Sequence, residues 1–192
     1  MFDLGGVLLH LNGPREAFDL QMTEDEFLMR WIHSPSVRDF ERGILDEESF
    51  ARNMVDEAGL PYDWREFIEK FNAWPDQLYP GILELLDDVA STHRCTLLSN
   101  TNAMHWERAG IGDELSPRFE QVFLSYVTGR LKPDADAFRM VQKELGCEAH
   151  QIVFFDDNPA NVEAASDCGW RSFATKGIDE LRDKLKLVGV TV

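Results

Sequence analysis

The sequence predicts an α/β fold, in which a parallel sheet carries helices on both faces and a small helical unit is inserted near the start of the chain. After residues 80–81, short apolar runs alternate with amphipathic helical stretches, a pattern typical of parallel α/β sheets. Residues 12–78, in contrast, show helical periodicity and no strand. We therefore expect residues 1–11 and 79–192 to form an α/β core domain and residues 12–78 a helical cap domain. The 192 residues, 44% of them hydrophobic, are enough for this arrangement.

The first strand is unusual because only two residues, Met1 and Phe2, precede the polar residue Asp3. A buried strand usually spans about five residues. Either this strand is short, or residues upstream of Met1 are missing from the sequence.

The inserted segment contains three helices with clear end signals. Thr23 followed by Glu26 predicts a capping box at the start of one helix. Asp46 predicts the N-cap of a second helix, which should end at Gly59. A third helix is expected over about residues 64–73.

The remaining elements alternate along the core domain. Pro133 suits the first turn of its helix. Strands are expected at residues 95–98, 121–125, 152–155 and 171–174, and helices at residues 82–91, 133–146, 159–168 and 179–187.

Charge and cysteine content exclude several classes of protein. With 19 Lys+Arg against 35 Asp+Glu, the formal net charge is −16, which argues against nucleic acid and against an anionic membrane as partners. Three widely spaced cysteines (Cys95, Cys147 and Cys168) predict neither a zinc site nor a disulfide framework. No apolar run approaches the roughly 18 residues of a membrane span, and the N-terminus lacks the basic stretch and apolar run of a signal peptide. We therefore expect a cytoplasmic protein.

Polar residues follow the predicted strands at the edge where parallel α/β sheets bind ligands. Asp3, Asp156 and Asp157 each come directly after an apolar run, and so does Ser99. Lys132 lies in the loop before a predicted helix. Clustered carboxylates repel one another, so their assembly favours a divalent cation, and an oxygen-only set suits Mg²⁺.

Four motifs in order resemble those of the haloacid dehalogenase superfamily. They are DLGGV at residues 3–7, LSNTN at 98–102, Lys132-Pro133, and FFDDN at 154–158. The resemblance covers nearly the whole chain and implies a Rossmann-like core with an inserted C1-type helical cap, as in subfamily IA. The DLGG opening and FERG at 40–43 resemble the subgroup that includes bacterial α-D-glucose-1-phosphate phosphatases.

The resemblance implies a magnesium-dependent phosphatase that acts through an aspartyl-phosphate. Asp3 would be the nucleophile and a Mg²⁺ ligand, and the backbone carbonyl of Gly5 a second ligand. Asp157 would bind Mg²⁺ directly, with Asp156 ligating or supporting it. The expected substrate is a small phosphorylated metabolite of the sugar-phosphate class, and the expected assembly is a monomer or a homodimer.

Three further residues would handle the phosphate group by the same resemblance. Ser99 and Asn100 would hold the transferring phosphate. Lys132 would neutralise charge on Asp3 and on the phosphoryl group, where charge spreads over the equatorial oxygens in the transition state.

The sequence departs from the phosphatase pattern of the family at one position. That pattern has a second Asp two residues after the nucleophile, which protonates the leaving group, and this chain has Gly5 there. Such acid–base help is typically worth about 10²–10⁴-fold in rate. His10 is a candidate replacement. A 2-haloacid dehalogenase, whose halide leaves without a proton, and a catalytically weak phosphometabolite-binding or regulatory protein are the alternatives.

Two observations concern substrate selection in the cap. Trp31 and Trp74 lie in this segment, and we consider one of them as a wall of the substrate pocket. Arg42 would either reach the substrate or pair with Glu41 or Asp46.

Overall fold

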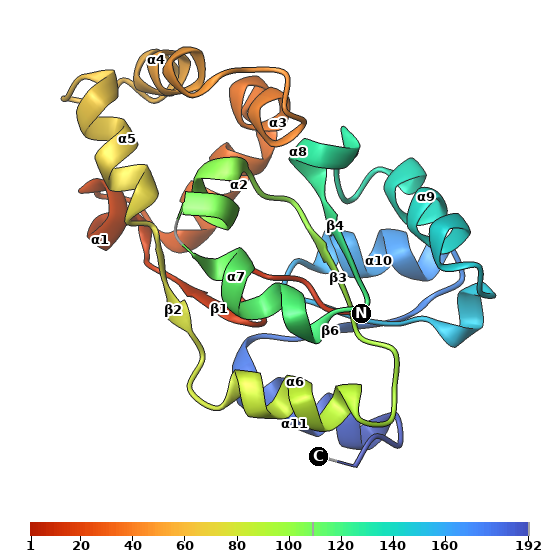
Figure 1. Cartoon of the computed structure of the whole chain (residues 1–192). Helices are drawn as coiled ribbons and strands as arrows, with labels where there is room; N and C mark the ends of the chain where they lie inside the picture. Colours follow the sequence, from red (N-terminus) through yellow and green to blue (C-terminus); the bar gives the residue numbers. More distant parts are fainter. Residues whose placement is uncertain (109, 192) are drawn as a thin grey trace.

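The computed structural model describes residues 1–108 and 110–191. Its central sheet is built from two parallel strand pairs (Figure 1). β3 (Thr96–Ser99) pairs with β4 (Gln121–Leu124), and β5 (Val153–Asp156) pairs with β6 (Arg171–Ala174). All four strands lie within one residue of their predicted positions.

The first three residues join the two pairs and form the middle of the sheet. Phe2 makes parallel bridges to Leu97 of β3 and to Phe155 of β5. Its N–H donates to the Thr96 carbonyl at 3.0 Å, and the Asp3 N–H donates to the Phe155 carbonyl at 2.9 Å. The first strand is therefore short, and it ends with Asp3 at the carboxyl edge of the sheet.

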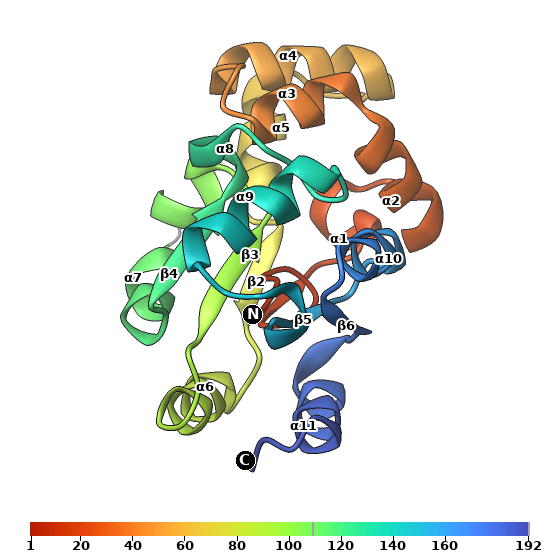
Figure 2. The same cartoon turned by 90° about the vertical axis from the view of Figure 1, so that its right-hand side faces the viewer.

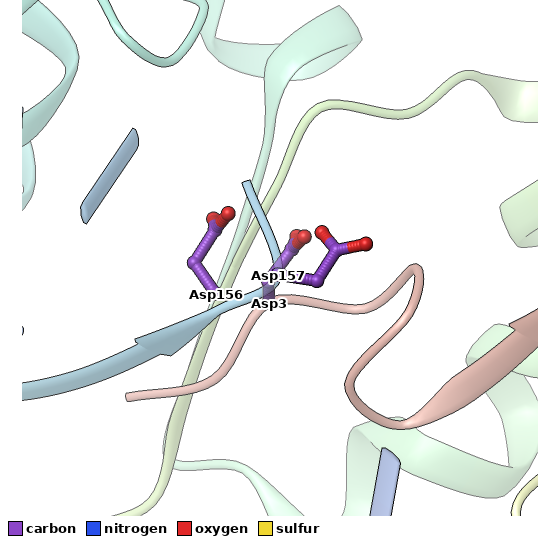
Figure 3. A group of neighbouring side chains, drawn as sticks. All are labelled: Asp3, Asp156 and Asp157. Carbon is purple, nitrogen blue, oxygen red and sulfur yellow. The ribbon is translucent and has the colours of Figure 1, made fainter. Parts of the chain in front are cut away.

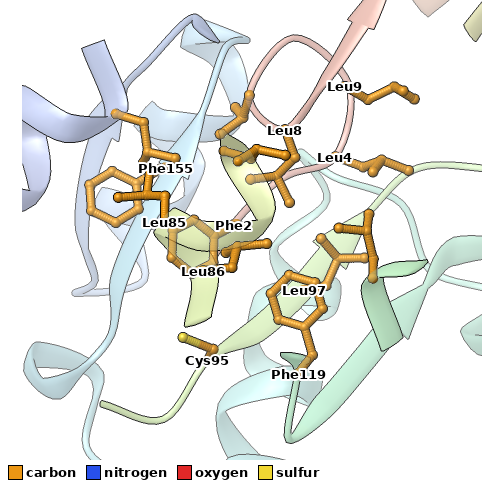
Figure 4. Packing of buried hydrophobic residues seen from close by; sticks show 14 of the residues in the cluster. Phe2, Leu4, Leu8, Leu9, Leu85, Leu86, Cys95, Leu97, Phe119 and Phe155 are labelled. Carbon is orange, nitrogen blue, oxygen red and sulfur yellow. The ribbon is translucent and has the colours of Figure 1, made fainter. Parts of the chain in front are cut away.

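Each face of the sheet has its own apolar cluster, because successive strand residues point to opposite sides. Leu97 packs in the cluster between the sheet and helices α6 and α11. Leu98 packs in the cluster between the sheet and helices α9 and α10, on the other face (Figures 1 and 2). Figure 4 shows the first of these clusters, in which Phe2 and Phe155 stack. These four helices are α6 (Ile82–Ala90), α9 (Ala135–Leu145), α10 (Pro159–Asp167) and α11 (Gly177–Leu187).

The cap is a bundle of short helices at the end of the molecule opposite α6 and α11 (Figures 1 and 2). Its aromatic core is separate from the two clusters of the sheet and is centred on Phe50 and Phe71, both fully buried. The predicted capping box is present, with the Glu26 N–H donating to Thr23 Oγ1 at 3.2 Å. The five helices are α1 (Pro14–Phe18), α2 (Glu24–His33), α3 (Pro35–Glu41), α4 (Glu47–Ala58) and α5 (Trp64–Asn72).

The prediction that residues 12–78 contain no strand is wrong at their end. β2 (Pro75–Leu78) pairs antiparallel with β1 (Leu9–Leu11), so that two strands connect the cap to the core. Four residues without alternating hydrophobicity give no local strand signal, and the partner lies more than sixty residues away in the chain.

The other differences are short elements that local patterns do not specify. The helix expected from Pro133 begins two residues later, because Asp134 is its N-cap. The structure adds two short cap helices that were not predicted, α1 and α3. It also adds the π-helix η1 (Met104–Arg108), helices α7 (Ile111–Leu115) and α8 (Ser125–Thr128), and the 3₁₀ turns η2 (Ser116–Arg118) and η3 (Ala149–Gln151). Within the described ranges, no helix combines the length and the apolarity needed to cross a bilayer.

Candidate active site

Three carboxylates converge at the carboxyl edge of the sheet (Figure 3). Asp3 ends the central strand segment, and Asp156 and Asp157 lie at the end of β5, so the parallel pairing brings them together. One carboxylate oxygen from each lies within 4.8 Å of the others. The sequence prediction that these three acids share one site therefore agrees with the structure.

Lys132 lies between two of these carboxylates. Its Nζ is 2.8 Å from Asp3 Oδ1 and 2.5 Å from Asp156 Oδ2. Only 3% of the residue is exposed. Burial lowers the pKa of this ammonium, but the two carboxylates outweigh burial and raise the pKa to about 12. Lys132 is therefore a permanent positive charge beside the expected nucleophile.

Asn100 holds the backbone of Lys132 in place. Its Nδ2 donates to the Lys132 carbonyl at 2.8 Å, and its Oδ1 accepts from the Lys132 N–H at 2.9 Å. The amide side chain is thus engaged at both ends, so a phosphate contact from Asn100 would use its backbone N–H. Ser99 is buried and lines the same cavity. Phosphate binding by Ser99 and Asn100 stays a prediction.

Asp156 is surrounded by donors from the protein itself. Its carboxylate is fully buried and accepts from Lys132 Nζ, from the Asn158 N–H at 2.9 Å and from Asn161 Nδ2 at 3.0 and 3.1 Å. These bonds use both oxygens, which favours the supporting role over direct metal ligation. The sequence reasoning missed Asn161, although an Asn five residues after Asp156, near the start of a helix, is a visible signal.

The other two carboxylates have no such set of donors. Burial, with a smaller contribution from neighbouring carboxylates, raises the pKa of Asp3 to about 8 even though Lys132 opposes the shift. Burial and the charge of Asp156 raise the pKa of Asp157 to about 6. Both carboxyl groups are therefore harder to ionise than a free Asp, and a bound metal cation would favour their ionised form. Mg²⁺ is a small, hard cation that prefers oxygen ligands, so the carboxylates of Asp3 and Asp157 suit it.

The two glycines after Asp3 have different structural roles. Gly6 has φ +71°, and a Cβ there would lie 2.1 Å from Asp157 Oδ2, so only glycine permits this approach. At Gly5, a Cβ would meet Leu11 Cδ1 at 3.1 Å. A Cβ at position 5 would therefore require the Leu11 side chain to move by a few tenths of an ångström. Metal ligation by the Gly5 carbonyl stays a prediction.

A cavity of about 170 Å³ lies between this carboxyl edge and the cap. The core contributes Asp3, Ser99, Lys132 and Asp157 to its lining, and the cap contributes apolar and charged side chains. Both tryptophans considered from the sequence, Trp31 and Trp74, line it. Sequence reasoning missed two charged cap residues in the lining, Arg38 and Glu41.

Two expectations about side chains near the site are wrong. His10 does not line the cavity: the pleat of β1 turns it outward beside the buried Leu9, and its Nδ1 lies 3.1 Å from Asp76 Oδ2. Arg42 pairs with neither Glu41 nor Asp46. Its Nη2 contacts Asp134 at 3.0 Å, which links the cap to the start of α9.

Comparison with known proteins identifies the family. The sequence model of the haloacid dehalogenase-like hydrolase family matches residues 1–169 of this chain. The chain belongs to this family of hydrolases.

Named relatives of this hydrolase include phosphatases. Flavin mononucleotide hydrolase 1 of Arabidopsis thaliana is 30% identical over 174 residues, which cover 90% of this chain and 67% of the relative. D-ribitol-5-phosphate phosphatase of Bacteroides thetaiotaomicron is 22% identical, and the match covers 98% of this chain and 96% of the relative.

A solved structure confirms the predicted fold class. It is a haloacid dehalogenase family enzyme from Bacteroides thetaiotaomicron in complex with magnesium and inorganic phosphate. The likeness has a TM-score of 0.70 at 22% identity and covers 91% of this chain and 92% of that chain.

Proposed function

We propose that this hydrolase is a magnesium-dependent phosphatase that acts on a small phosphorylated metabolite, a sugar phosphate, through an aspartyl-phosphate on Asp3. One observation carries the proposal: Asp3 Oδ1 is 2.8 Å from the buried Lys132 ammonium, and the carboxylate of Asp157 is close by. A carboxylate that faces both a fixed cation and a metal site is suited to attack phosphorus. The phosphatases among the relatives support this reaction class.

The residues around Asp3 would have two different roles, metal binding and orientation of Lys132. Asp3, Asp157 and the Gly5 carbonyl would hold Mg²⁺, which when bound would neutralise phosphate oxygens. Asp156 would orient Lys132 rather than bind the metal, because its oxygens already accept hydrogen bonds. The family likeness to a magnesium and phosphate complex supports the choice of metal.

The phosphoryl group would be held from the side of the sheet. Lys132 would neutralise charge on the phosphoryl oxygens as the ester bond breaks. The Ser99 hydroxyl and the Asn100 N–H would bind the same oxygens. Because Asn100 fixes the Lys132 backbone at both ends, the ammonium is preorganised for this task.

The size of the cavity favours a small substrate. Its volume of about 170 Å³ is below the ~300–1,000 Å³ of pockets for drug-sized ligands. A polar edge from Arg38 and Glu41 next to the Trp31 ring suits the hydroxyls and the apolar face of a sugar. We further infer a cytoplasmic location, on the basis of the three free cysteines. The monomer or homodimer expected from the sequence stays a prediction.

A phosphate-release assay on a panel of phosphorylated metabolites, with Mg²⁺ and with chelator, tests the proposal. We expect turnover only with the metal, and loss of turnover in Asp3→Asn. Asp76→Asn is the control, because it removes a surface carboxylate that does not line the cavity. Activity that survives Asp3→Asn would refute the nucleophile. Chloride release from chloroacetate without metal would support a dehalogenase, and tight phosphate-ester binding without turnover would support a binding protein.

A further inference from the structure

The leaving oxygen of the substrate needs a proton that position 5 cannot supply. Gly5 has no side chain, and Leu11 packs against it. An alkoxide is a poor leaving group, so a proton donor elsewhere in the cavity is expected to speed its departure. Among the described residues, the titratable side chains that line the cavity are Asp3, Arg38, Glu41, His105, Lys132 and Asp157.

Most of these side chains are engaged in other tasks. Asp3 and Asp157 are assigned to the phosphoryl group and the metal, and Lys132 is held by two carboxylates. Arg38 stays charged, and its Nη2 contacts Asp134 at 3.0 Å. These four groups are therefore poor sources of the proton.

His105 is also unsuitable as the donor. Its Nε2 is 2.8 Å from the Phe71 carbonyl, and its Nδ1 is 3.3 Å from Asn102 Nδ2. Both ring nitrogens thus face polar atoms of the protein. Burial lowers the pKa of His105 to about 4, so the ring is neutral near pH 7.

Glu41 remains, and its place in the cavity suits the task. It is the last residue of α3 and lines the cavity from the cap helices, whereas Asp3 lines the same cavity from the sheet edge. Phosphoryl transfer places the attacking and leaving oxygens roughly in line. A phosphate attacked by Asp3 from the sheet edge therefore directs its leaving oxygen toward the cap.

We propose that Glu41 is the acid–base residue of this phosphatase, which supplies from the cap what position 5 lacks. As the ester P–O bond breaks, the Glu41 carboxylic acid donates its proton to the leaving oxygen and the alcohol departs. The resulting Glu41 carboxylate then takes a proton from the water that attacks the aspartyl-phosphate. Inorganic phosphate and free Asp3 are released, and Glu41 is again protonated. This inference rests on the proposed function.

The surroundings of Glu41 allow it to exchange a proton near neutral pH. Burial raises the pKa of Glu41 to about 7, against a hydrogen bond from Trp31 and the positive charges of Lys132 and Arg38. A residue that must donate a proton and then accept one works best when its pKa is close to the working pH. Glu41 meets this condition.

The test compares two leaving groups in the wild type and in Glu41→Gln. p-Nitrophenolate leaves without a proton, whereas the alkoxide of a sugar phosphate needs one. We expect kcat/KM for the best sugar phosphate of the panel to fall about 10²–10⁴-fold. For p-nitrophenyl phosphate, kcat/KM should change less than about tenfold, because it reports only the steps up to release of the leaving group.

Two further measurements separate this role from a structural one. With p-nitrophenyl phosphate, Glu41→Gln should show a burst of p-nitrophenol followed by slow turnover, because the second proton transfer is also lost. The wild-type decline of sugar-phosphate kcat/KM above about pH 7 should disappear. Asp39→Asn is the matched control, since it removes a carboxylate from the same helix outside the cavity.

The results that overturn the inference differ from those that overturn the proposed function. Equal loss of kcat/KM on both substrates, or loss on neither, would refute the role of Glu41 while phosphatase activity stands. If Glu41→Gln does not fold, Glu41→Asp replaces it. That variant keeps the carboxyl group, and its kcat/KM should fall for sugar phosphates but not for p-nitrophenyl phosphate. A wild type without turnover on either substrate would refute the proposed function itself.

Discussion

Asp156 and Asp157 are adjacent in the chain, but their removal should have opposite consequences. Asp156 is fully buried and bonded to Lys132, Asn158 and Asn161. Asp157 is partly exposed, and its pKa is raised to about 6 by burial and by Asp156. We therefore expect Asp156→Asn to damage the fold and Asp157→Asn to damage metal binding.

The loss of unfolding free energy expected for Asp156→Asn follows from the buried Lys132 charge that the substitution leaves with one partner fewer. Removal of one partner of a buried ion pair costs about 3–5 kcal/mol of unfolding free energy. Lys132 keeps its contact with Asp3 at 2.8 Å, which places the expected loss near the lower figure. Asp157→Asn removes a carboxylate that is costly to ionise, so the metal-free stability should stay within about 1 kcal/mol of the wild type.

Urea unfolding at pH 7.5, with and without Mg²⁺, measures both effects. Asp156→Asn should lower the metal-free stability and keep a stabilising response to Mg²⁺. Asp157→Asn should keep the stability and lose that response. Glu120→Gln, which breaks the exposed pair with Arg94, is the control and should cost less than about 1 kcal/mol. Equal losses of metal-free stability in the two Asp variants would contradict the assignment of support to one and ligation to the other.

Three other predictions address the glycine turn, pH and the cap. Gly6→Ala should abolish the Mg²⁺ response, because its Cβ would lie 2.1 Å from Asp157 Oδ2, and calorimetric Mg²⁺ titration checks this loss. The folded-state pKa of Asp157 is raised from 3.8 to about 6, so its contribution to metal-free stability is present below pH ~4 and is lost as the pH rises through 6. The rise in melting temperature on adding Mg²⁺ should therefore be larger at pH 8 than at pH 5.5, and equal rises would contradict this sign. Asp134→Asn removes the negative charge that pairs with both Arg38 and Arg42 at 3.0 Å. Steady-state kinetics should then show KM raised about fivefold, with little change in stability.

The parts of the fold that depend on local patterns were predictable from the sequence. Apolar runs with clear end signals placed the strands of the sheet, and the Thr23–Glu26 capping box placed the start of α2. β2 (Pro75–Leu78) was not predictable, because its strand character comes from pairing with residues near the N-terminus. The cluster of Asp3, Asp156 and Asp157 was also predictable, because ligands bind at the carboxyl ends of parallel strands and those ends can be located from the sequence.

The finer division of roles at the site depends on contacts that no spacing encodes. The sequence left open whether Asp156 ligates the metal or supports another residue. Its hydrogen bonds with Asn161 and Lys132 favour support, and the Asn100 clamp on Lys132 is equally a product of three-dimensional packing. His10 lies near Asp3 in sequence, yet the pleat of β1 carries it to the surface. Sequence proximity to the nucleophile was therefore a poor guide to the acid–base residue.

The position of Glu41 shows why such a residue is found only after the cap helices and the sheet are placed together in the fold. On its own, a Glu at the end of a seven-residue helix indicates nothing more than solvent-exposed charge. Once the cap helices lie over the sheet edge, the same side chain is half-buried and lines the cavity that Asp3 also lines. The chemistry proposed for Glu41 would then exist only when the cap is closed. Cap closure would thereby couple exclusion of water to the supply of the proton, so a loosened cap should slow sugar phosphates more than p-nitrophenyl phosphate.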